Sequence, residues 1–428
     1  MSTLVLEPAK KGLTGRLKVP GDKSISHRAV IFSSLAKGVS HITNFLTGED
    51  CLRTVEAFRQ MGVEITKEKD CLTVHGNGID ALKEPAVPIN FGNSGTTARL
   101  MSGVLAGLPL FTTAFGDQSL SRRPMDRVVQ PLSEMGALIR GREQASYLPL
   151  AFEGKKLRGR IHQLQVKSAQ VKSALLLAGL LAEGETTVVE QGRTRNHTEM
   201  LLPLFGAEVQ TKGASITVKG GQQLQGADFQ VPGDISSAAF FLVGAAITPN
   251  SDLNIVNVGL NPTRNGVVQA LEKMGAAIET TITSYVGEEP VGDMRISHSS
   301  LKAITLEGDL IANLIDEIPI LALAATQAEG TTIIKDAKEL RVKETDRIEA
   351  VAHNLTQLGA NVETREDGLA IHGPTPLHGG ELHSYGDHRI GMMGAIASLI
   401  TTSKVSIADK ECINISYPNF FEDLHGLL

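Results

Sequence analysis

Two carboxylates in the C-terminal third of the chain stand among cations. Asp316 lies in "LIDEIP", and Glu344 lies in "RVKETDR", directly after Lys343 and three residues before Arg347. Two carboxyl groups in different environments can serve as acid and base in one reaction. Each also has a simpler interpretation, because Asp316 could only cap a helix and Glu344 could only pair with a cation. Both are therefore candidate proton-transfer groups.

Basic residues recur beside the starts of the expected helices, in a chain whose net charge is −6. Such a concentration of cations favours a small substrate that carries several negative charges. The alternative is a set of solvated loops that bind nothing. The cations are Lys23, Arg28, Arg122, Arg123, Arg127, Arg195, Arg264, Lys343, Arg347, Arg389 and Lys410, and uncharged candidates beside them are Ser24, Gly95, Ser168, Ala169 and Gln170.

Several classes of function are disfavoured by what the sequence lacks. The acidic balance, the absence of Trp and the 4% of aromatic residues argue against nucleic-acid binding. His27, His197 and His388 are dispersed, so no metal is expected, and neither a P-loop nor a G-x-G-x-x-G pattern supports a nucleotide cofactor. The start of the chain is too weakly apolar for a secretion signal, and no apolar run approaches the ~18 residues of a membrane span. Three widely spaced cysteines favour reduced thiols and a cytoplasmic location.

The elements that must position these residues repeat along the chain. One recurrent element is a two-sided helix that ends in an apolar residue and Gly, followed by a short strand. It occurs at Gly62, Gly136, Gly206, Gly275 and Gly359, and "NFFEDLHGLL" at 419–428 is expected to be a sixth such helix.

A second recurrent element is an apolar helix that begins at Asp, Asn or Ser, residue types that cap helix N-termini. Its nearly continuous apolar character predicts burial. The expected first residues are Asp22, Asn93, Ser168, Asp234, Asp316 and Asp387. The chain therefore reads as six α/β units of about 70 residues, too small to bury a core singly, so that three should pack together into one lobe.

The tetrapeptide V-P-G-D occurs twice, at Val19 and at Val231, at the starts of the first and fourth units. We expect the chain to cross between lobes there, near 19–22 and 231–234. The expected N-terminal lobe is 21–231, and the C-terminal lobe is 1–20 with 232–428. The first copy carries Lys23, Ser24 and Arg28, where the second has Ile235, Ser236 and Phe240. Only the first copy has the cations, so only the first is expected to bind an anion.

Motifs along nearly the whole chain resemble the 5-enolpyruvylshikimate-3-phosphate synthase family. They are "GDKSISHR", "GNSGTTARL", "RRPM", "SAQVKSALL", "PGDISSAAF", "IDEIPILA", "RVKETDRI" and "GDHRIGM". The resemblance implies a two-lobed inside-out α/β barrel of six βαβαββ-type repeats, three per lobe. It also implies a 3-phosphoshikimate 1-carboxyvinyltransferase of the shikimate pathway, which moves enolpyruvyl from phosphoenolpyruvate to the 5-hydroxyl of shikimate 3-phosphate and releases phosphate.

The family pattern implies a role for each matching residue. Asp316, Glu344 and Lys23 would be catalytic. Shikimate 3-phosphate would be bound by Lys23, Ser24, Arg28, Ser168, Ala169, Gln170, Arg195, Asp316 and Lys343. Phosphoenolpyruvate would be bound by Lys23, Gly95, Arg123, Gln170, Arg347, Arg389 and Lys410. The resemblance further implies a monomer without cofactor, closure of the lobes over the substrates, and competitive inhibition by glyphosate.

The sequence departs from many members of the family at a few positions. Ala169 replaces a second serine, Leu100 stands where many members have proline, and Glu339 stands where some have asparagine. Two other functions remain as alternatives. The related transferases that act on UDP-N-acetylglucosamine carry a loop cysteine that "GDQSLSRRP" lacks. A non-catalytic anion-binding protein would not need the pair Asp316 and Glu344.

Overall fold

The computed structural model describes residues 3–428, which divide into two compact units. The N-terminal unit comprises 21–231 and the short segment Tyr285–Glu289. The C-terminal unit comprises 1–20, 232–284 and 290–428. Each unit contains three small sheets with helices, so the described residues form six open sheets in a mixed α/β fold.

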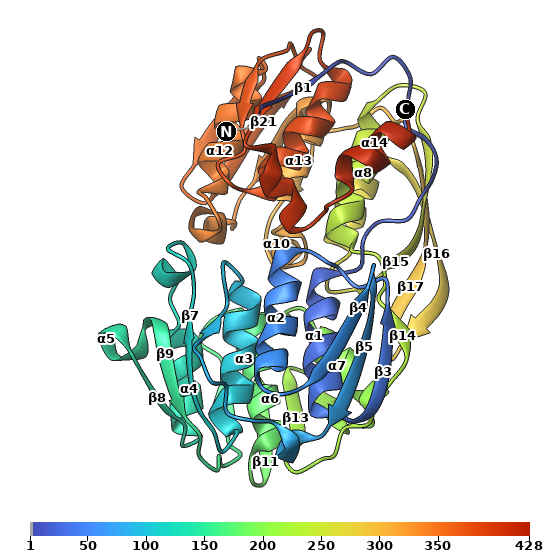
Figure 1. Ribbon diagram of the computed structural model, residues 1–428. Coiled ribbons are helices and arrows are strands. Elements are labelled where there is room, and N and C mark those ends of the chain that lie inside the picture. Colours follow the sequence, from blue (N-terminus) through green and yellow to red (C-terminus); the bar gives the residue numbers. More distant parts are fainter. Residues whose placement is uncertain (1–2) are drawn as a thin grey trace. The chain divides into compact units, whose positions relative to one another are not determined.

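The N-terminal unit packs buried helices against the inner faces of its three sheets (Figure 1). Its helices are α1 (Lys23–Leu35), α2 (Glu49–Gln60), α3 (Gly95–Gly107), α4 (Asp126–Glu134), α5 (Arg142–Ala145), α6 (Ala169–Leu181) and α7 (His197–Leu201). The first sheet has the strand order β14 (Phe229–Gln230), β3 (Lys37–Thr43), β5 (Cys71–Asn77) and β4 (Glu64–Glu68). The second has the order β6 (Ile89–Asn90), β7 (Phe111–Phe115), β9 (Tyr147–Glu153) and β8 (Leu138–Gly141). The third has the order β10 (Ile161–Gln163), β11 (Glu185–Val189), β13 (Ser215–Lys219) and β12 (Val209–Lys212).

The C-terminal unit repeats this arrangement. Its helices are α8 (Ile235–Ile247), α9 (Gly266–Lys273), α10 (Asp309–Leu314), α11 (Ile318–Thr326), α12 (Arg347–Gln357), α13 (His388–Ala397) and α14 (Phe420–Gly426). Its first sheet has the strand order β16 (Ala277–Val286), β17 (Glu289–Ser297), β15 (Asp252–Gly259) and β2 (Thr14–Leu17). The second has the order β18 (Thr305–Leu306), β19 (Gly330–Ile334), β21 (Gly368–Gly373) and β20 (Asn361–Arg365). The third has the order β1 (Thr3–Leu6), β23 (Val405–Ala408) and β22 (Glu381–His383).

The strand order shows why the repeat is a folding unit. Each sheet contains one parallel pair of strands, and one strand of the pair follows a buried helix. For example, β7 follows α3 and pairs with β6, and β19 follows α11 and pairs with β18. The N-terminal segment completes two sheets of the C-terminal unit, because β2 pairs with β15 and β1 pairs with β23. Residues 3–20 therefore fold with the C-terminal half of the chain.

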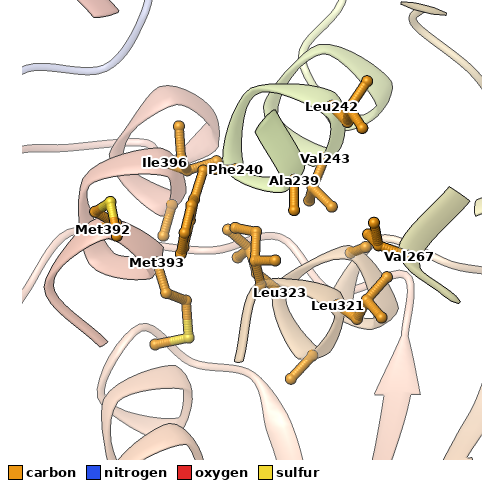
Figure 2. Close-up of a cluster of buried hydrophobic side chains, with 14 of the residues drawn as sticks. Ala239, Phe240, Leu242, Val243, Val267, Leu321, Leu323, Met392, Met393 and Ile396 are labelled. Carbon is orange, nitrogen blue, oxygen red and sulfur yellow. The ribbon is translucent and has the colours of Figure 1, made fainter. Parts of the chain in front are cut away.

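The core of the C-terminal unit forms where the three apolar helices meet. α8, α11 and α13 contact one another, and their side chains are almost completely buried. Figure 2 shows Phe240 of α8 pointing toward Met393 and Ile396 of α13, with Leu323 of α11 beside them, while Leu321 of α11 lies next to Val267. Burying a large apolar side chain contributes about 1.5–3 kcal/mol, so this cluster is a main source of the unit's stability.

Close helix packing in the N-terminal unit depends on small residues. α3 and α6 lie against each other, and a Cβ atom added at Gly103 of α3 would lie 2.1 Å from the carbonyl oxygen of Ala174 in α6. No side chain fits at that distance. The small-residue character of the buried helices therefore serves their packing.

The expected helix ends are confirmed at all five glycines. Gly62, Gly136, Gly206, Gly275 and Gly359 have positive φ angles between 78° and 102°, which glycine adopts without steric cost. Segment 419–428 also forms the expected helix, α14.

Four of the six predicted caps are confirmed and two are wrong. Asp22, Ser168, Asp234 and Asp387 each accept a backbone N–H bond at a helix start. Ser94 caps α3 in place of Asn93, whose side chain instead bonds Asp117 and Arg123. Glu317 precedes α11 without a side-chain cap, and the carboxylate of Asp316 pairs with cations.

A buried hydrogen-bond chain joins the first three helices of the N-terminal unit. His27 Nδ1 of α1 lies 2.7 Å from Thr54 Oγ1 of α2, which lies 2.8 Å from Thr97 Oγ1 of α3. Thr97 Oγ1 in turn lies 2.7 Å from Oγ of Ser94, the cap of α3. Burial is the main cause that lowers the pKa of His27 from 6.5 to about 3, although Asp50 opposes the shift.

This buried histidine should make folding sensitive to acid. Below pH 6.5 the unfolded chain binds a proton that folded His27 does not bind until about pH 3, so stability falls as the pH falls through that window. Chemical denaturation of His27→Gln should therefore show a pH slope of the free energy of unfolding that is smaller by about 1.4 kcal/mol per pH unit. The exposed His353→Gln is the control, and equal slopes in wild type and His27→Gln would contradict the assignment.

Candidate active site

In the C-terminal unit, three carboxylates surround one buried arginine. Arg347 is the first residue of α12 and only 1% exposed. Its Nη1 donates to Asp316 (3.1 Å), its Nη2 to Glu344 (2.7 Å), and its Nε to Asp387 (2.8 Å). Lys343 Nζ lies 3.5 Å from the same Asp316 oxygen. The structure thus brings both candidate proton-transfer residues onto one guanidinium group.

Three separate segments of the chain position the residues of this cluster. Asp316 lies just before α11, Lys343 and Glu344 follow the short helix η4 (Lys338–Val342), and Asp387 caps α13 by accepting the N–H of Arg389. Asp387 is fully buried, whereas Asp316 is 13% and Glu344 is 28% exposed at the side chain. The two carboxylates that water can reach are therefore the two proposed for proton transfer.

Electrostatics keep Arg347 charged despite its burial. Burial alone would lower the pKa of Arg347, but the carboxylates of Asp387, Glu344 and Asp316 outweigh burial and raise the pKa above its ordinary value. A buried cation with three acceptors is a fixed positive charge. It holds the carboxylates in place and offers donors to an incoming anion.

Arg389 is held beside this cluster through a second buried acid. Arg389 Nη1 lies 3.6 Å from Glu317, whose carboxylate also accepts a hydrogen bond from Ser236. Ser236 Oγ accepts a further bond, 2.6 Å long, from Arg264 Nη2. Lys410 starts the short helix η6 (Lys410–Ile415) and is half-buried; within residues 3–428 no ion pair or hydrogen bond joins it to Arg347 or Arg389.

In the N-terminal unit, the start of α3 forms a second concentration of cations. A Cβ atom at Gly95 would lie 3.2 Å from Arg99 Nη1 and 3.4 Å from Arg123 Nη1, so both guanidinium groups face this glycine. Gln170 bridges the starts of α3 and α6, because its Oε1 accepts from Arg99 (2.6 Å) and its Nε2 donates to Thr96 (3.1 Å). Two guanidinium groups and a helix N-terminus together suit an anion.

The remaining candidates of this unit lie near the starts of α1 and α6 and on loop 191–196. Lys23 pairs with Asp50 of α2. Arg28 is 4% exposed and donates to Thr198 Oγ1 (2.8 Å), Ser173 Oγ (2.6 Å) and the carbonyl oxygen of Ser24 (2.9 Å). Ser168 and Ala169 lie at the start of α6, and Arg195 lies partly exposed in the loop before α7.

Sequence reasoning missed four side chains of these clusters. Arg99, Asp50 and Glu317 were not selected, and Asp387 was selected only as a cap. Arg99 could have been found, because it follows Gly95 by four residues on the same helical face. The partners of Asp50, Glu317 and Asp387 lie far away in sequence, so no local spacing pointed to them.

The comparisons with known proteins are consistent along the whole chain. Residues 8–424 match the family model described as EPSP synthase (3-phosphoshikimate 1-carboxyvinyltransferase). The chain belongs to the EPSP synthase family. It is therefore an enzyme of the carboxyvinyltransferase class.

Relatives and solved structures support the same assignment. The chain is 55% identical over 428 residues to the 3-phosphoshikimate 1-carboxyvinyltransferase of Oceanobacillus iheyensis, and 52% identical over 427 residues to that of Bacillus cereus. Both alignments cover 100% of this chain and of the relative. EPSP synthase from Acinetobacter baumannii superimposes with a TM-score of 0.91 at 44% identity, over 99% of this chain and 98% of that chain.

A more distant structure shows the fold alone. The enolpyruvyl transferase NikO from Streptomyces tendae superimposes with a TM-score of 0.82 at 18% identity, over 99% of this chain and 97% of that one. The expected enolpyruvyl-transferase fold is confirmed. Within residues 3–428, no helix is both long and apolar enough to cross a membrane, and no cluster of His, Cys, Asp or Glu is suited to a metal ion.

Proposed function

We propose that this member of the EPSP synthase family transfers enolpyruvyl from phosphoenolpyruvate to the 5-hydroxyl of shikimate 3-phosphate and releases phosphate. The observation that carries the proposal is the full-length identity of 55% to a protein named 3-phosphoshikimate 1-carboxyvinyltransferase. The cation clusters add a physical reason, because both substrates are small anions with a phosphate group.

Shikimate 3-phosphate is assigned to residues of both units. The N-terminal ends of α1 and α6 are the positive ends of helix dipoles and suit its phosphate, and Arg195 adds a positive charge. Asp316 and Lys343 are assigned to its ring hydroxyls. The full set is Lys23, Ser24, Arg28, Ser168, Ala169, Gln170, Arg195, Asp316 and Lys343. Arg28 also holds Ser24, Ser173 and Thr198 in place through one hydrogen bond to each of them.

Phosphoenolpyruvate is assigned to the guanidinium groups. Gly95 leaves the start of α3 open, where Arg123 can approach the ligand, and Gln170 holds the neighbouring Arg99 in place. In the C-terminal unit Arg347 and Arg389 are the donors, each already held by a carboxylate. The full set is Lys23, Gly95, Arg123, Gln170, Arg347, Arg389 and Lys410.

The reaction needs proton transfers onto C3, from the 5-hydroxyl, off C3 again and onto the departing phosphate, and the cluster on Arg347 holds two candidate groups for them. In the proposed mechanism Glu344 gives a proton to C3 of phosphoenolpyruvate, and a cation develops at C2. The 5-hydroxyl adds to C2 while Asp316, assisted by Lys23, takes the hydroxyl proton. Glu344, now a carboxylate, then takes a proton back from C3, and phosphate leaves C2 with the proton held by Asp316. The enol ether forms and both acids return to their starting states, so that atoms and charge balance.

The geometry suggests how Glu344 could acquire its proton. Arg347 Nη2 lies 2.7 Å from Glu344 and donates to its carboxylate. An anionic group of phosphoenolpyruvate that accepts from Arg347 would compete for that donor and bring negative charge close to Glu344. Both effects favour protonation. Binding of phosphoenolpyruvate would thus promote protonation of Glu344, the acid that acts on it.

Gly95→Ala should weaken phosphoenolpyruvate binding without unfolding the protein. The new methyl group would lie 3.2 Å from Arg99 Nη1 and 3.4 Å from Arg123 Nη1, contacts that flexible arginine ends can relieve by moving. We expect the KM for phosphoenolpyruvate to rise by about tenfold and the KM for shikimate 3-phosphate to change little, in steady-state kinetics. An unchanged KM for phosphoenolpyruvate would remove Gly95 from the site.

Phosphate release tests the proposed function. The purified chain should release phosphate only when shikimate 3-phosphate and phosphoenolpyruvate are both present, and mass spectrometry should detect the enolpyruvyl ether. UDP-N-acetylglucosamine in place of shikimate 3-phosphate should give no phosphate. Activity with that sugar nucleotide, or inactivity with both acceptors, would contradict the proposal.

Three finer properties stay predictions. We expect a monomer, a cytoplasmic location and competitive inhibition by glyphosate, an anion of similar size to phosphoenolpyruvate. Light scattering, cell fractionation and inhibition kinetics at varied phosphoenolpyruvate would test them in turn.

A further inference from the structure

The N-terminal unit contains a cavity of about 490 Å³ that shares no lining residue with the proposed substrate sites. Its walls come from the end of β11 and loop 190–196, from α7, from β12 and β13, and from Glu288 in segment 285–289. The volume lies within the range of small-molecule sites, about 300–1,000 Å³. The cavity is therefore large enough for a ligand of its own.

Carboxylates dominate the polar part of the cavity lining. Glu190, Glu199 and Glu288 contribute three, against one cation, Arg193. Behind the lining, fully buried Lys172 lies 2.7 Å from Glu199 Oε1 and 3.1 Å from Glu190 Oε1. Lys172 fixes these two acids and leaves the lining with a net negative charge.

One oxygen in this lining lacks a donor. Glu199 is only 7% exposed, and within residues 3–428 its Oε2 is buried without a hydrogen-bond partner. Glu190 differs, because its Oε1 accepts from the backbone N–H of Thr194 (3.2 Å) and also from the Thr194 hydroxyl. A buried carboxylate oxygen without a donor costs free energy, and a cation in the adjoining cavity would offset part of that cost by electrostatic attraction.

The other part of the lining is apolar. Met200, Pro203, Val209 and Ile216 provide it, and Ile216 and Val209 come from the sheet that forms the floor. A hydrated metal ion would leave these side chains without contacts. An organic ligand with a charged end and an apolar body would use both parts of the cavity.

We propose that this cavity binds a small organic cation, with an ammonium group that is attracted by the carboxylates of Glu199 and Glu288 and an apolar body that packs against Met200 and Ile216. Glu288 lies exposed in the lining and adds attraction where the ligand enters. The proposal concerns binding alone, so it holds or fails whether or not the chain transfers enolpyruvyl.

The probe is 2-phenylethylammonium, and its neutral control is 2-phenylethanol, which has the same shape. The full chain is labelled with ¹³C in the methionine methyl groups, and the Met200 signal is assigned from Met200→Leu. The ammonium compound should shift the Met200 signal saturably, and the alcohol should bind at least about tenfold more weakly because it lacks the charge. Equal binding of the two compounds, or no saturable shift of Met200 at millimolar probe, would overturn the proposal.

Neighbouring residues of β12 offer a matched pair of variants. Thr211 lines the cavity, whereas Gln210 points to the other face of the strand, and both are exposed. Thr211→Trp should abolish the Met200 shift, and Gln210→Trp should leave it unchanged. Binding that survives Thr211→Trp would place the ligand elsewhere.

Two charge variants test the chemistry of recognition. Glu199→Gln and Glu288→Gln should each weaken binding of the ammonium compound while 2-phenylethanol binds as before. Glu199 also holds Lys172, so the methionine spectrum first confirms folding. If Glu199→Gln does not fold, binding is judged from the exposed Glu288→Gln and from the pair Thr211→Trp and Gln210→Trp. Unchanged affinity in the folded charge variants would refute the proposal.

Discussion

Replacing Arg347 by methionine should lower the free energy of unfolding by about 3–5 kcal/mol and remove measurable turnover. Methionine fills much of the same space but leaves Asp316, Glu344 and fully buried Asp387 without their shared cation. Asp387 loses the most, because two donors from Arg347 disappear and, within residues 3–428, the N–H of Arg389 is the donor that remains. Urea denaturation followed by circular dichroism measures the loss.

The same substitution at Arg365 is the control for this prediction. Arg365 is exposed at the end of β20, so Arg365→Met should change stability by less than about 0.5 kcal/mol. The denaturation midpoints should then differ widely between the two variants. Similar midpoints would mean that Arg347 does not stabilise the buried carboxylates.

Glu344→Gln should slow turnover by about 10²-fold or more, with only a modest change in the KM of either substrate. Glutamine keeps the size of the side chain and can still accept from Arg347 through its amide oxygen, so the cluster should remain folded. It cannot give a proton to carbon. The expected defect is therefore in kcat, measured by phosphate release at saturating substrates.

Glu349→Gln is the matched control for Glu344→Gln. Glu349 lies five residues later and also accepts from an arginine, Arg341 (3.1 Å), but it is exposed on α12. Its replacement should leave kcat within about twofold of wild type, because an exposed ion pair contributes little. If Glu344→Gln behaved in the same way, Glu344 would be a structural partner of Arg347 and another group would supply the proton.

Much of the fold could be predicted because each repeat carries local signals. Gly62 and its four counterparts end helices for a reason visible in the sequence, since a left-handed residue must follow the last turn. The two wrong caps show the limit of such signals. Asn93 and Asp316 are residue types that cap helices, but Arg123 and Arg347, distant in sequence, compete for their oxygens.

The sequence was sufficient to predict which residues form the candidate site, but only partly how they contact one another. Arg347 was expected to bind an anionic substrate, whereas the structure shows it already holding three carboxylates. Asp387 reaches it across 40 residues, and such a contact depends on how α12 and α13 pack. No spacing within one motif contains that information.

Deuterium incorporation tests the central claim, that the acid on Arg347 protonates C3 of phosphoenolpyruvate, most directly. The enzyme is mixed with shikimate 3-phosphate and phosphoenolpyruvate in D₂O, and the methylene group of the product is read by proton NMR and mass spectrometry. We predict deuterium at C3 of the product in wild type, formed only when both substrates are present, and at least about 10²-fold slower in Glu344→Gln. A product that contains no deuterium at C3 would contradict the account.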